Sequence, residues 1–144
     1  MKSILFVCIE NSCRSQMAEG FARAIADFPM CVASAGTRPA LRVDQGAVEV
    51  MRELGIDISR QVPKPIDLKA VENYDYVITM GCGADGICPA SFLGVSDDWK
   101  IPDPKGKGIE EFRRVRDLIR TKVDALINIL LNVPSDEFIL HAER

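Results

Sequence analysis

A cysteine and an arginine near the N-terminus have the types and the spacing for oxyanion chemistry. They lie in the stretch CIENSCRS, residues 8–15, where five residues separate Cys8 from Arg14. A thiolate is a nucleophile, and a guanidinium can hold two oxygens of a tetrahedral anion in its planar fork. The spacing alone is a weak signal, but the pair lies between the apolar run 4–7 and a predicted helix. We therefore interpret the stretch as an anion-binding loop that also supplies a nucleophile.

The predicted loop has further groups that attract negative charge. Backbone N–H groups at a helix N-terminus lack partners within the helix, and a curled loop points more of them at one centre. They favour a bound oxyanion and the thiolate of Cys8, and Ser15 adds a hydroxyl donor. Asn11 tolerates left-handed backbone angles, and its side chain can brace the turn. The predicted oxyanion site comprises Ile9, Glu10, Asn11, Ser12, Cys13, Arg14 and Ser15.

Two features of this loop need separate interpretation. Cys8 could simply be the last buried residue of a strand, but that interpretation leaves Arg14 at a buried strand–helix junction unexplained. Glu10 is unusual in an anion-binding loop, because an inward carboxylate would repel the ligand. We therefore predict that Glu10 points outward.

The rest of the chain alternates between predicted strands and helices. Apolar runs predict strands over residues 3–7, 31–35, 56–59, 76–80 and 95–99. Helical patterns cover residues 15–27, 44–54, 68–72 and 109–130, with Asp44 as an N-cap and Gly55 as a C-terminal stop. This alternation predicts an α/β fold, a single-domain three-layer sandwich with a central four- to five-stranded, mostly parallel sheet and helices on both faces. We expect the domain to span residues 1–133 and a tail to follow at 134–144.

Polar and catalytic residue types follow the predicted strands. The segments in question are Cys8–Ser15, Gly36–Thr37, Gly81–Gly83 and Asp103–Pro104. Right-handed crossovers place the carboxyl ends of parallel strands at one edge of the sheet, where ligands bind in such folds. The sequence therefore predicts one active site at this edge.

Composition excludes several classes of protein. The net charge of −3 and the lack of a basic block argue against nucleic-acid binding. Apolar runs are too short for a membrane span, and the N-terminus does not resemble a signal peptide. Five cysteines, an odd number at uneven spacing, do not resemble a disulfide framework. We therefore expect a cytoplasmic protein, and nothing in the sequence suggests more than a monomer.

The N-terminal stretch resembles a known family. Residues 6–19, FVCIENSCRSQMAE, are similar to the phosphate loop of the low-molecular-weight protein tyrosine phosphatase superfamily, and within it to arsenate reductases of the thioredoxin-coupled type. Four further segments are similar in the same order: Ser34–Thr37, Gly55–Ser59, Val77–Met80 and Trp99–Pro104. The resemblance runs from about residue 2 to the end of the last helix and does not include the tail.

The resemblance implies a reaction and roles for particular residues. Cys8 would attack arsenate, Cys82 would then attack Cys8, and Cys88 would attack Cys82. Thioredoxin or a similar external dithiol would reduce the final disulfide, and Asp103 would act as general acid. No tightly bound cofactor or metal is implied.

The resemblance also suggests a monovalent-cation site near Asn11, Glu19 and Ser34. The ordinary roles of Glu19 and Ser34, on a helix surface and at a strand end, are equally consistent with the sequence. Cys13 and Cys31 are expected to be small core residues.

Several alternatives remain open at this stage. The protein could be a phosphatase that hydrolyses phosphate monoesters through a phosphocysteine, with Cys8, Arg14 and Asp103. In that case Cys82 and Cys88 would be inert loop thiols. They could also be zinc ligands, although a structural zinc site needs four nitrogen or sulfur donors. A redox-sensing or oxyanion-binding module without turnover is a further possibility. Two other acids, Asp97 and Asp98, are alternatives to Asp103 as the general acid. His141 is expected to be a solvated residue of the tail.

Overall fold

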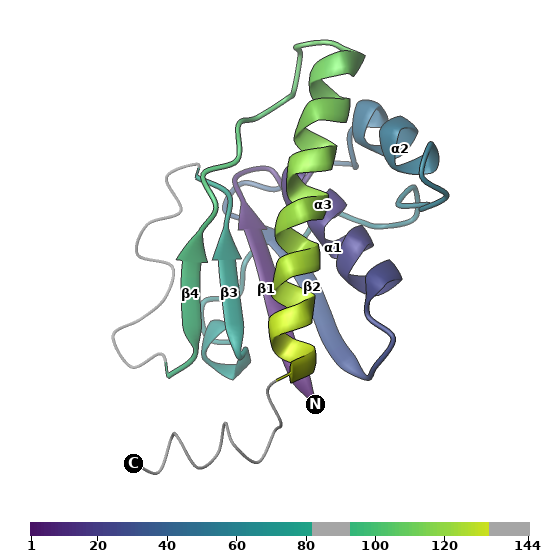
Figure 1. The fold of residues 1–144 in the computed structure, drawn as a ribbon. Helices are drawn as coiled ribbons and strands as arrows, with labels where there is room; N and C mark the ends of the chain where they lie inside the picture. Colours follow the sequence, from purple (N-terminus) through teal and green to yellow (C-terminus); the bar gives the residue numbers. More distant parts are fainter. Residues whose placement is uncertain (82–92, 133–144) are drawn as a thin grey trace.

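The computed structural model describes residues 1–81 and 93–132. It contains eight elements, shown in Figure 1: β1 (Lys2–Cys8), α1 (Arg14–Ile25), β2 (Met30–Gly36), α2 (Gln45–Arg52), the 3-10 helix η1 (Val71–Asn73), β3 (Tyr76–Thr79), β4 (Val95–Asp98) and α3 (Ile109–Asn132). Cys82, Cys88 and His141 therefore lie outside the described residues. So does the predicted boundary between domain and tail, which stays a prediction.

The four strands form one parallel sheet in the order β2-β1-β3-β4. The central strand β1 places Cys8 opposite Gly36 on one side and Val7 opposite Thr79 on the other. All four carboxyl ends therefore meet at one edge, as predicted, and the loops there carry the candidate site (Figure 1).

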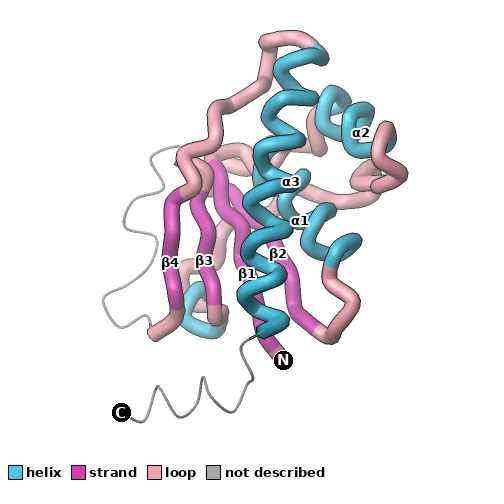
Figure 2. Tube along the Cα trace, viewed as in Figure 1, coloured by secondary structure: helices cyan, strands magenta, loops and turns pink. Residues whose placement is uncertain are grey.

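The sheet carries helices on both faces, but unevenly. Alternate residues of β1, including Ile4 and Phe6, point into a large core shared with α1, α2 and α3. Leu5 and Val7 point to the other face and pack with Val71 of η1. Figure 2 shows the three α-helices gathered on one side of the strands. The predicted three-layer α/β sandwich with a four- to five-stranded sheet is confirmed, and the described residues contribute four strands.

The boundaries of α2 follow the predicted signals. Asp44 precedes the helix with extended backbone angles, and its side chain accepts a hydrogen bond of 2.8 Å from the backbone N–H of Gly46. Beyond the helix, Gly55 adopts a φ of 77°, the left-handed conformation that glycine permits and that ends helices. Both predictions are confirmed.

Two other predictions were wrong in detail. Residues 56–59 form no strand, because the side chain of Ile58 is fully buried against α1. The contact is close at Gly20 of α1, where an added Cβ would lie 2.7 Å from the Ile58 side chain. The backbone N–H of Ser59 bonds to the Asp57 carboxylate at 2.9 Å, which closes a turn instead. The helix expected over 68–72 is the single turn η1 at 71–73.

The α3 helix is the longest in the described part of the chain, and it is amphipathic. Its apolar stripe packs on α1 and α2, while its other face carries charged side chains. Across residues 1–81 and 93–132, no helix combines the length and hydropathy that a membrane span requires.

Candidate active site

The segment after β2 holds the loop between β1 and α1 in place. Backbone N–H groups of this segment donate to four consecutive or nearly consecutive loop carbonyls. The pairs are Thr37 to Cys8 at 3.3 Å, Arg38 to Ile9 at 2.8 Å, Ala40 to Glu10 at 2.9 Å and Asp44 to Ser12 at 2.9 Å. The loop carbonyls are thus turned outward, away from the centre of the loop.

Several backbone N–H groups of the loop are available to a ligand in the part of the chain that the structure describes. Within the described residues, none of the backbone N–H groups of Ile9, Glu10, Ser12 and Cys13 donates to a protein acceptor. These groups, together with the start of α1, border a pocket of about 550 Å³. Unpaired N–H groups at a helix N-terminus attract an anion through their partial charges. The pocket therefore has the geometry of an oxyanion site.

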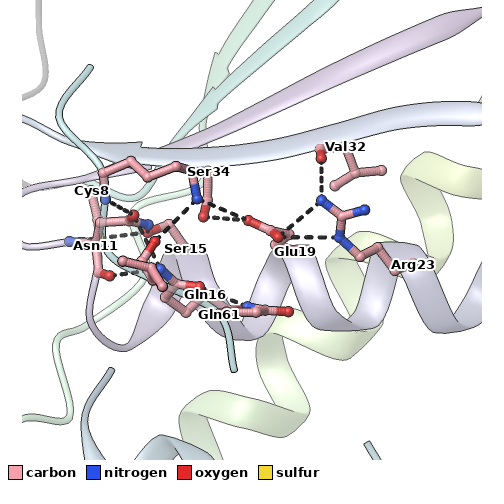
Figure 3. A network of polar contacts seen from close by, with 11 residues as sticks. Cys8, Asn11, Ser15, Gln16, Glu19, Arg23, Val32, Ser34 and Gln61 are labelled. Carbon is pink, nitrogen blue, oxygen red and sulfur yellow. Dashed lines mark hydrogen bonds and ion pairs between the residues drawn. The ribbon is translucent and has the colours of Figure 1, made fainter. Parts of the chain in front are cut away.

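Cys8 lies at this pocket with two hydrogen-bonding neighbours. Its Sγ is 2.8 Å from Ser15 Oγ, and the backbone N–H of Asn11 donates to it at 3.2 Å. Because Ser15 Oγ already accepts from Asn11 Nδ2 at 2.7 Å, the serine hydrogen is available for the sulfur (Figure 3). Two hydrogen-bond donors are therefore directed at the sulfur of Cys8.

Asn11 shapes the loop through its backbone and its side chain. Its φ is 52°, the left-handed conformation that the sequence predicts. Its Oδ1 accepts from Gln16 Nε2 at 3.1 Å and from the backbone N–H of Lys64 at 2.9 Å. These two donors fix the direction of the amide, so that Nδ2 faces Ser15. The buried side chain therefore links the start of α1 and the distant residue Lys64 to Ser15, which contacts Cys8.

We expect Asn11→Ala to destabilise the protein by about 2–4 kcal/mol. The change leaves the buried hydrogen-bonding partners of Asn11 unsatisfied. It also places alanine, whose side chain forms no hydrogen bond, at a positive φ that alanine rarely adopts. Asn11→Gly loses the same side-chain bonds but tolerates the backbone angle, so it should be more stable than Asn11→Ala by about 1 kcal/mol. Urea unfolding of both variants measures the difference. Equal midpoints would show that the backbone angle carries no cost.

Arg14 is held firmly at the pocket. Its Nη1 donates to the carbonyls of Met80 at 3.1 Å and Ile101 at 2.9 Å, and the side chain is only 7% exposed. These bonds connect the loop to the residues that follow β3 and β4. They fix the plane of the guanidinium, which leaves its other edge to the pocket.

Asp103 is the acidic residue nearest to this guanidinium in the pocket lining. Its Oδ2 lies 3.7 Å from Arg14 Nη2, and its side chain is 52% exposed. Its Oδ1 accepts from the backbone N–H of Lys105 at 3.1 Å. The rival acids Asp97 and Asp98 do not line the pocket, and Asp98 instead accepts from the backbone N–H of Lys100. The pocket therefore brings Asp103 to the same space as Cys8.

Two cations of the pocket were missed by sequence reasoning. Arg38 and Lys105 line it together with Cys8, Ile9, Glu10, Ser12, Cys13, Arg14 and Asp103. Lys105 Nζ donates to both carboxylate oxygens of Glu10, at 2.8 Å to Oε2, and this bond raises the pKa of Lys105. Glu10 was predicted to point outward, but it lines the pocket, where the ammonium of Lys105 balances its charge. Both cations follow strand ends, the signal that could have found them.

The other two described cysteines differ from one another. Cys13 is buried in the pocket wall, where burial, and after it the charge of Asp44, raises its pKa from 9.0 to about 12. Its thiol is therefore neutral at physiological pH and a poor nucleophile. Cys31 was expected in the core but is exposed, because it is the second residue of β2, at the far end of the strand from the site.

Glu19 is buried on α1 and already bonded to protein groups. Its Oε1 accepts from Ser34 Oγ at 2.6 Å, and its Oε2 accepts from Arg23 Nε at 3.1 Å (Figure 3). Lys64 Nζ lies 4.0 Å from Oε1. Two protein cations thus face this carboxylate, so these contacts do not fit a further monovalent cation. The cation site near Asn11, Glu19 and Ser34 stays a prediction without support here.

The described chain reaches Gly81 next to β1, the strand that ends at Cys8. The backbone N–H of Met80 donates to Val7 at 3.1 Å, so β3 ends beside the end of β1. Gly81 has a φ of 86°, and a Cβ there would lie 2.7 Å from Lys100 Cα. Only glycine fits this close approach. The predicted roles of Cys82 and Cys88, just beyond, stay predictions.

This combination of fold and pocket agrees with what comparison with known proteins finds. The family model described as low molecular weight phosphotyrosine protein phosphatase matches residues 3–134, and the chain belongs to that family.

Relatives within it carry a more specific name. The chain is 42% identical over 130 residues to a glutaredoxin arsenate reductase of Synechocystis sp., covering 88% of this chain and 97% of the relative. It is 42% identical over 124 residues to an arsenate reductase of Staphylococcus aureus, covering 85% and 94%. A solved arsenate reductase in the phosphate binding state superposes with a TM-score of 0.79 at 41% identity, covering 89% and 98%.

Proposed function

We propose that this protein reduces arsenate to arsenite. The observation that carries the proposal is the sulfur of Cys8, bonded by Ser15 and Asn11 at a pocket bordered by free loop N–H groups and Arg14. Such a pocket suits a tetrahedral oxyanion next to a thiolate. Relatives with 42% identity over most of the chain are named arsenate reductases, which favours arsenate among such oxyanions.

The first proposed step forms a bond between sulfur and arsenic. The Cys8 thiolate attacks arsenic, an As–OH bond breaks, and the leaving hydroxyl group takes a proton from Asp103 and departs as water. Arg14 and the loop N–H groups hold the remaining oxygens and stabilise their charge. Asp103 is proposed as the acid because it alone of the three candidate aspartates lines the pocket.

The next steps transfer two electrons. The Cys82 thiolate attacks Sγ of Cys8, a disulfide forms, and the S–As electron pair stays with arsenic, which leaves as arsenite. Cys88 then attacks Cys82 and releases the Cys8 thiolate, leaving an 82–88 disulfide. An external dithiol, thioredoxin or a similar protein such as glutaredoxin, reduces this disulfide by exchange. A monomer in a reducing compartment such as the cytosol suits this chemistry.

The pocket lining favours a small inorganic anion over an aryl phosphate ester. Among the described residues it contains charged, polar and aliphatic side chains and no aromatic ring. Trp99, which follows β4, instead packs against Phe6 with ring centroids 5.8 Å apart. An aromatic substrate would therefore find no stacking partner in this part of the pocket. Slow hydrolysis of phosphate monoesters is still expected, because the loop would hold phosphate in the same way.

The proposal is tested by mapping which sulfurs become joined after one equivalent of arsenate. Reduced protein is mixed with arsenate, quenched with acid and alkylating agent, and digested for peptide mass analysis. The wild type should give an 82–88 disulfide and one equivalent of arsenite. Cys88→Ser should accumulate an 8–82 disulfide instead, because the last exchange is blocked. Cys31→Ser is the matched control, since this cysteine is exposed and lies at the far end of β2.

The same experiment separates the two candidate reactions. Arsenite without any disulfide would contradict the cysteine relay. A protein that forms no arsenite but hydrolyses p-nitrophenyl phosphate rapidly would be a phosphatase with Cys8, Arg14 and Asp103. A protein that does neither, yet forms the 82–88 disulfide with oxidants, would be a redox-sensing module.

A further inference from the structure

The segment that carries Asp103 is attached to the anion-binding loop on both sides. On one side, Arg14 Nη1 bonds to the carbonyl of Ile101 at 2.9 Å. On the other side, Lys105 Nζ bonds to the carboxylate of Glu10. Asp103 stands midway between these two attachment points. The position of Asp103 in the pocket that Cys8 also lines therefore depends on both attachments.

The two attachments differ in strength and exposure. Arg14 is almost fully buried, and its bond to a backbone carbonyl resists solvent. The Glu10–Lys105 pair is partly exposed, with side-chain exposures of 35% and 48%. Partly exposed pairs contribute little to folding stability because water and salt screen them. Loss of this pair should therefore change the position of the segment more than it changes the stability of the fold.

The Glu10–Lys105 pair also controls charge at the entrance of the pocket. Both side chains line it, so an incoming oxyanion meets a carboxylate whose charge the ammonium balances. An unbalanced carboxylate at Glu10 would repel the oxyanion, whereas an unbalanced ammonium at Lys105 would attract it. The two single variants should therefore change anion affinity in opposite directions.

We propose that Glu10 and Lys105 form a bridge that positions Asp103 in the pocket lined by Cys8 and sets the affinity of the pocket for its oxyanion. Both are positioning residues rather than catalytic ones, because they act on the reaction through Asp103 and on anion binding through their charges. The backbone N–H of Lys105 donates to Asp103 Oδ1 at 3.1 Å, so a shift of Lys105 also shifts the carboxylate of Asp103. This inference rests on the proposed roles of Cys8 and Asp103.

Inorganic phosphate is the probe for affinity, because its binding requires neither arsenate nor a second cysteine. Calorimetric titration of Glu10→Gln should give a phosphate affinity about 3–10 times higher than that of the wild type, since Lys105 is left unbalanced. Lys105→Met should give an affinity lower by about the same factor, since Glu10 is left unbalanced. Arg114→Met and Glu111→Gln, which break a partly exposed ion pair on α3, are the matched controls and should leave the affinity unchanged.

The positioning role is tested by single-turnover rates at saturating arsenate. Both single variants should react about 3–10 times more slowly, although one binds the anion more tightly, because a mobile acid is correctly placed for less of the time. The exchanged double variant, Glu10→Lys with Lys105→Glu, restores the bridge and should recover the rate to within about threefold. Equal rates in all variants, or a failure of the exchange to rescue, would overturn the positioning role.

A failure of the bridge can be told apart from a failure of the proposed function. If neither the wild type nor any variant reduces arsenate, the rate of p-nitrophenyl phosphate hydrolysis still reports on Asp103, which would protonate the leaving group of that ester. The phosphate titrations also stand without any turnover. Affinities that move in the same direction in Glu10→Gln and Lys105→Met would overturn the charge argument whatever the physiological reaction is.

Discussion

Replacing Cys8 by serine is expected to lower arsenate reduction by at least about four orders of magnitude. A serine hydroxyl is a much weaker nucleophile than a thiolate, and Ser15 and Asn11 would have no anionic sulfur to stabilise. The fold and the anion site should persist, because the loop N–H groups and Arg14 are unchanged. Phosphate should therefore still bind, with an affinity within about tenfold of the wild type. Arsenite formation and calorimetric titration with phosphate measure the two expectations.

The same variant tests whether the second thiol of the pocket can substitute. Cys13 lines the pocket too, but its pKa of about 12 keeps it protonated at neutral pH. Residual turnover in Cys8→Ser that rises about tenfold per pH unit up to this value would point to Cys13 as a replacement nucleophile. Substantial turnover at neutral pH would instead contradict the assignment of Cys8. Cys31→Ser again serves as the control for loss of a single thiol.

Replacing Arg14 by lysine is expected to lower kcat/KM for arsenate by about 10²–10³-fold. The guanidinium donates to the carbonyls of Met80 and Ile101 and still has an edge for the oxyanion. A lysine ammonium is a compact charge on a flexible stem, so it cannot hold the two carbonyls and clasp two anion oxygens in one plane. It also releases one of the two attachments of the Asp103 segment. We therefore expect a loss in both phosphate affinity and single-turnover rate.

The control for this prediction is Arg114→Lys on α3, where the pair with Glu111 lies outside the pocket. Its kcat/KM should match that of the wild type. Thermal unfolding of both variants separates a local effect from loss of the folded state. An Arg14→Lys variant that keeps full activity would show that the charge of residue 14, and not its planar fork, is what the reaction needs.

Local signals made much of the fold and of the loop predictable. An apolar run followed by a cysteine, an asparagine suited to positive φ and an arginine describes the β1–α1 junction within 15 residues. The cap at Asp44 and the stop at Gly55 are equally local, because neighbouring atoms decide them. The parallel sheet follows from the alternation of elements alone.

The features that sequence reasoning missed depend on distant partners. Glu10 meets Lys105 across 95 positions of the chain, and no periodic pattern signals such a pair. The apolar alternation of Ile56 and Ile58 is the same for a strand and for an extended segment that packs on a helix. The small residue Gly20 on α1 makes room for Ile58, and this packing decided against the strand.

The outward-facing carbonyls of the anion loop have a consequence for the connection between β2 and α2. Surface connections usually accept changes of length, but this one is the template on which the loop takes its shape, through the N–H groups of residues 37, 38, 40 and 44. Adding or removing one residue there would shift every donor after it out of register with its carbonyl. We therefore expect residues 37–44 not to tolerate insertions, although surface turns ordinarily do. This holds even though Leu41, within this segment, is 96% exposed.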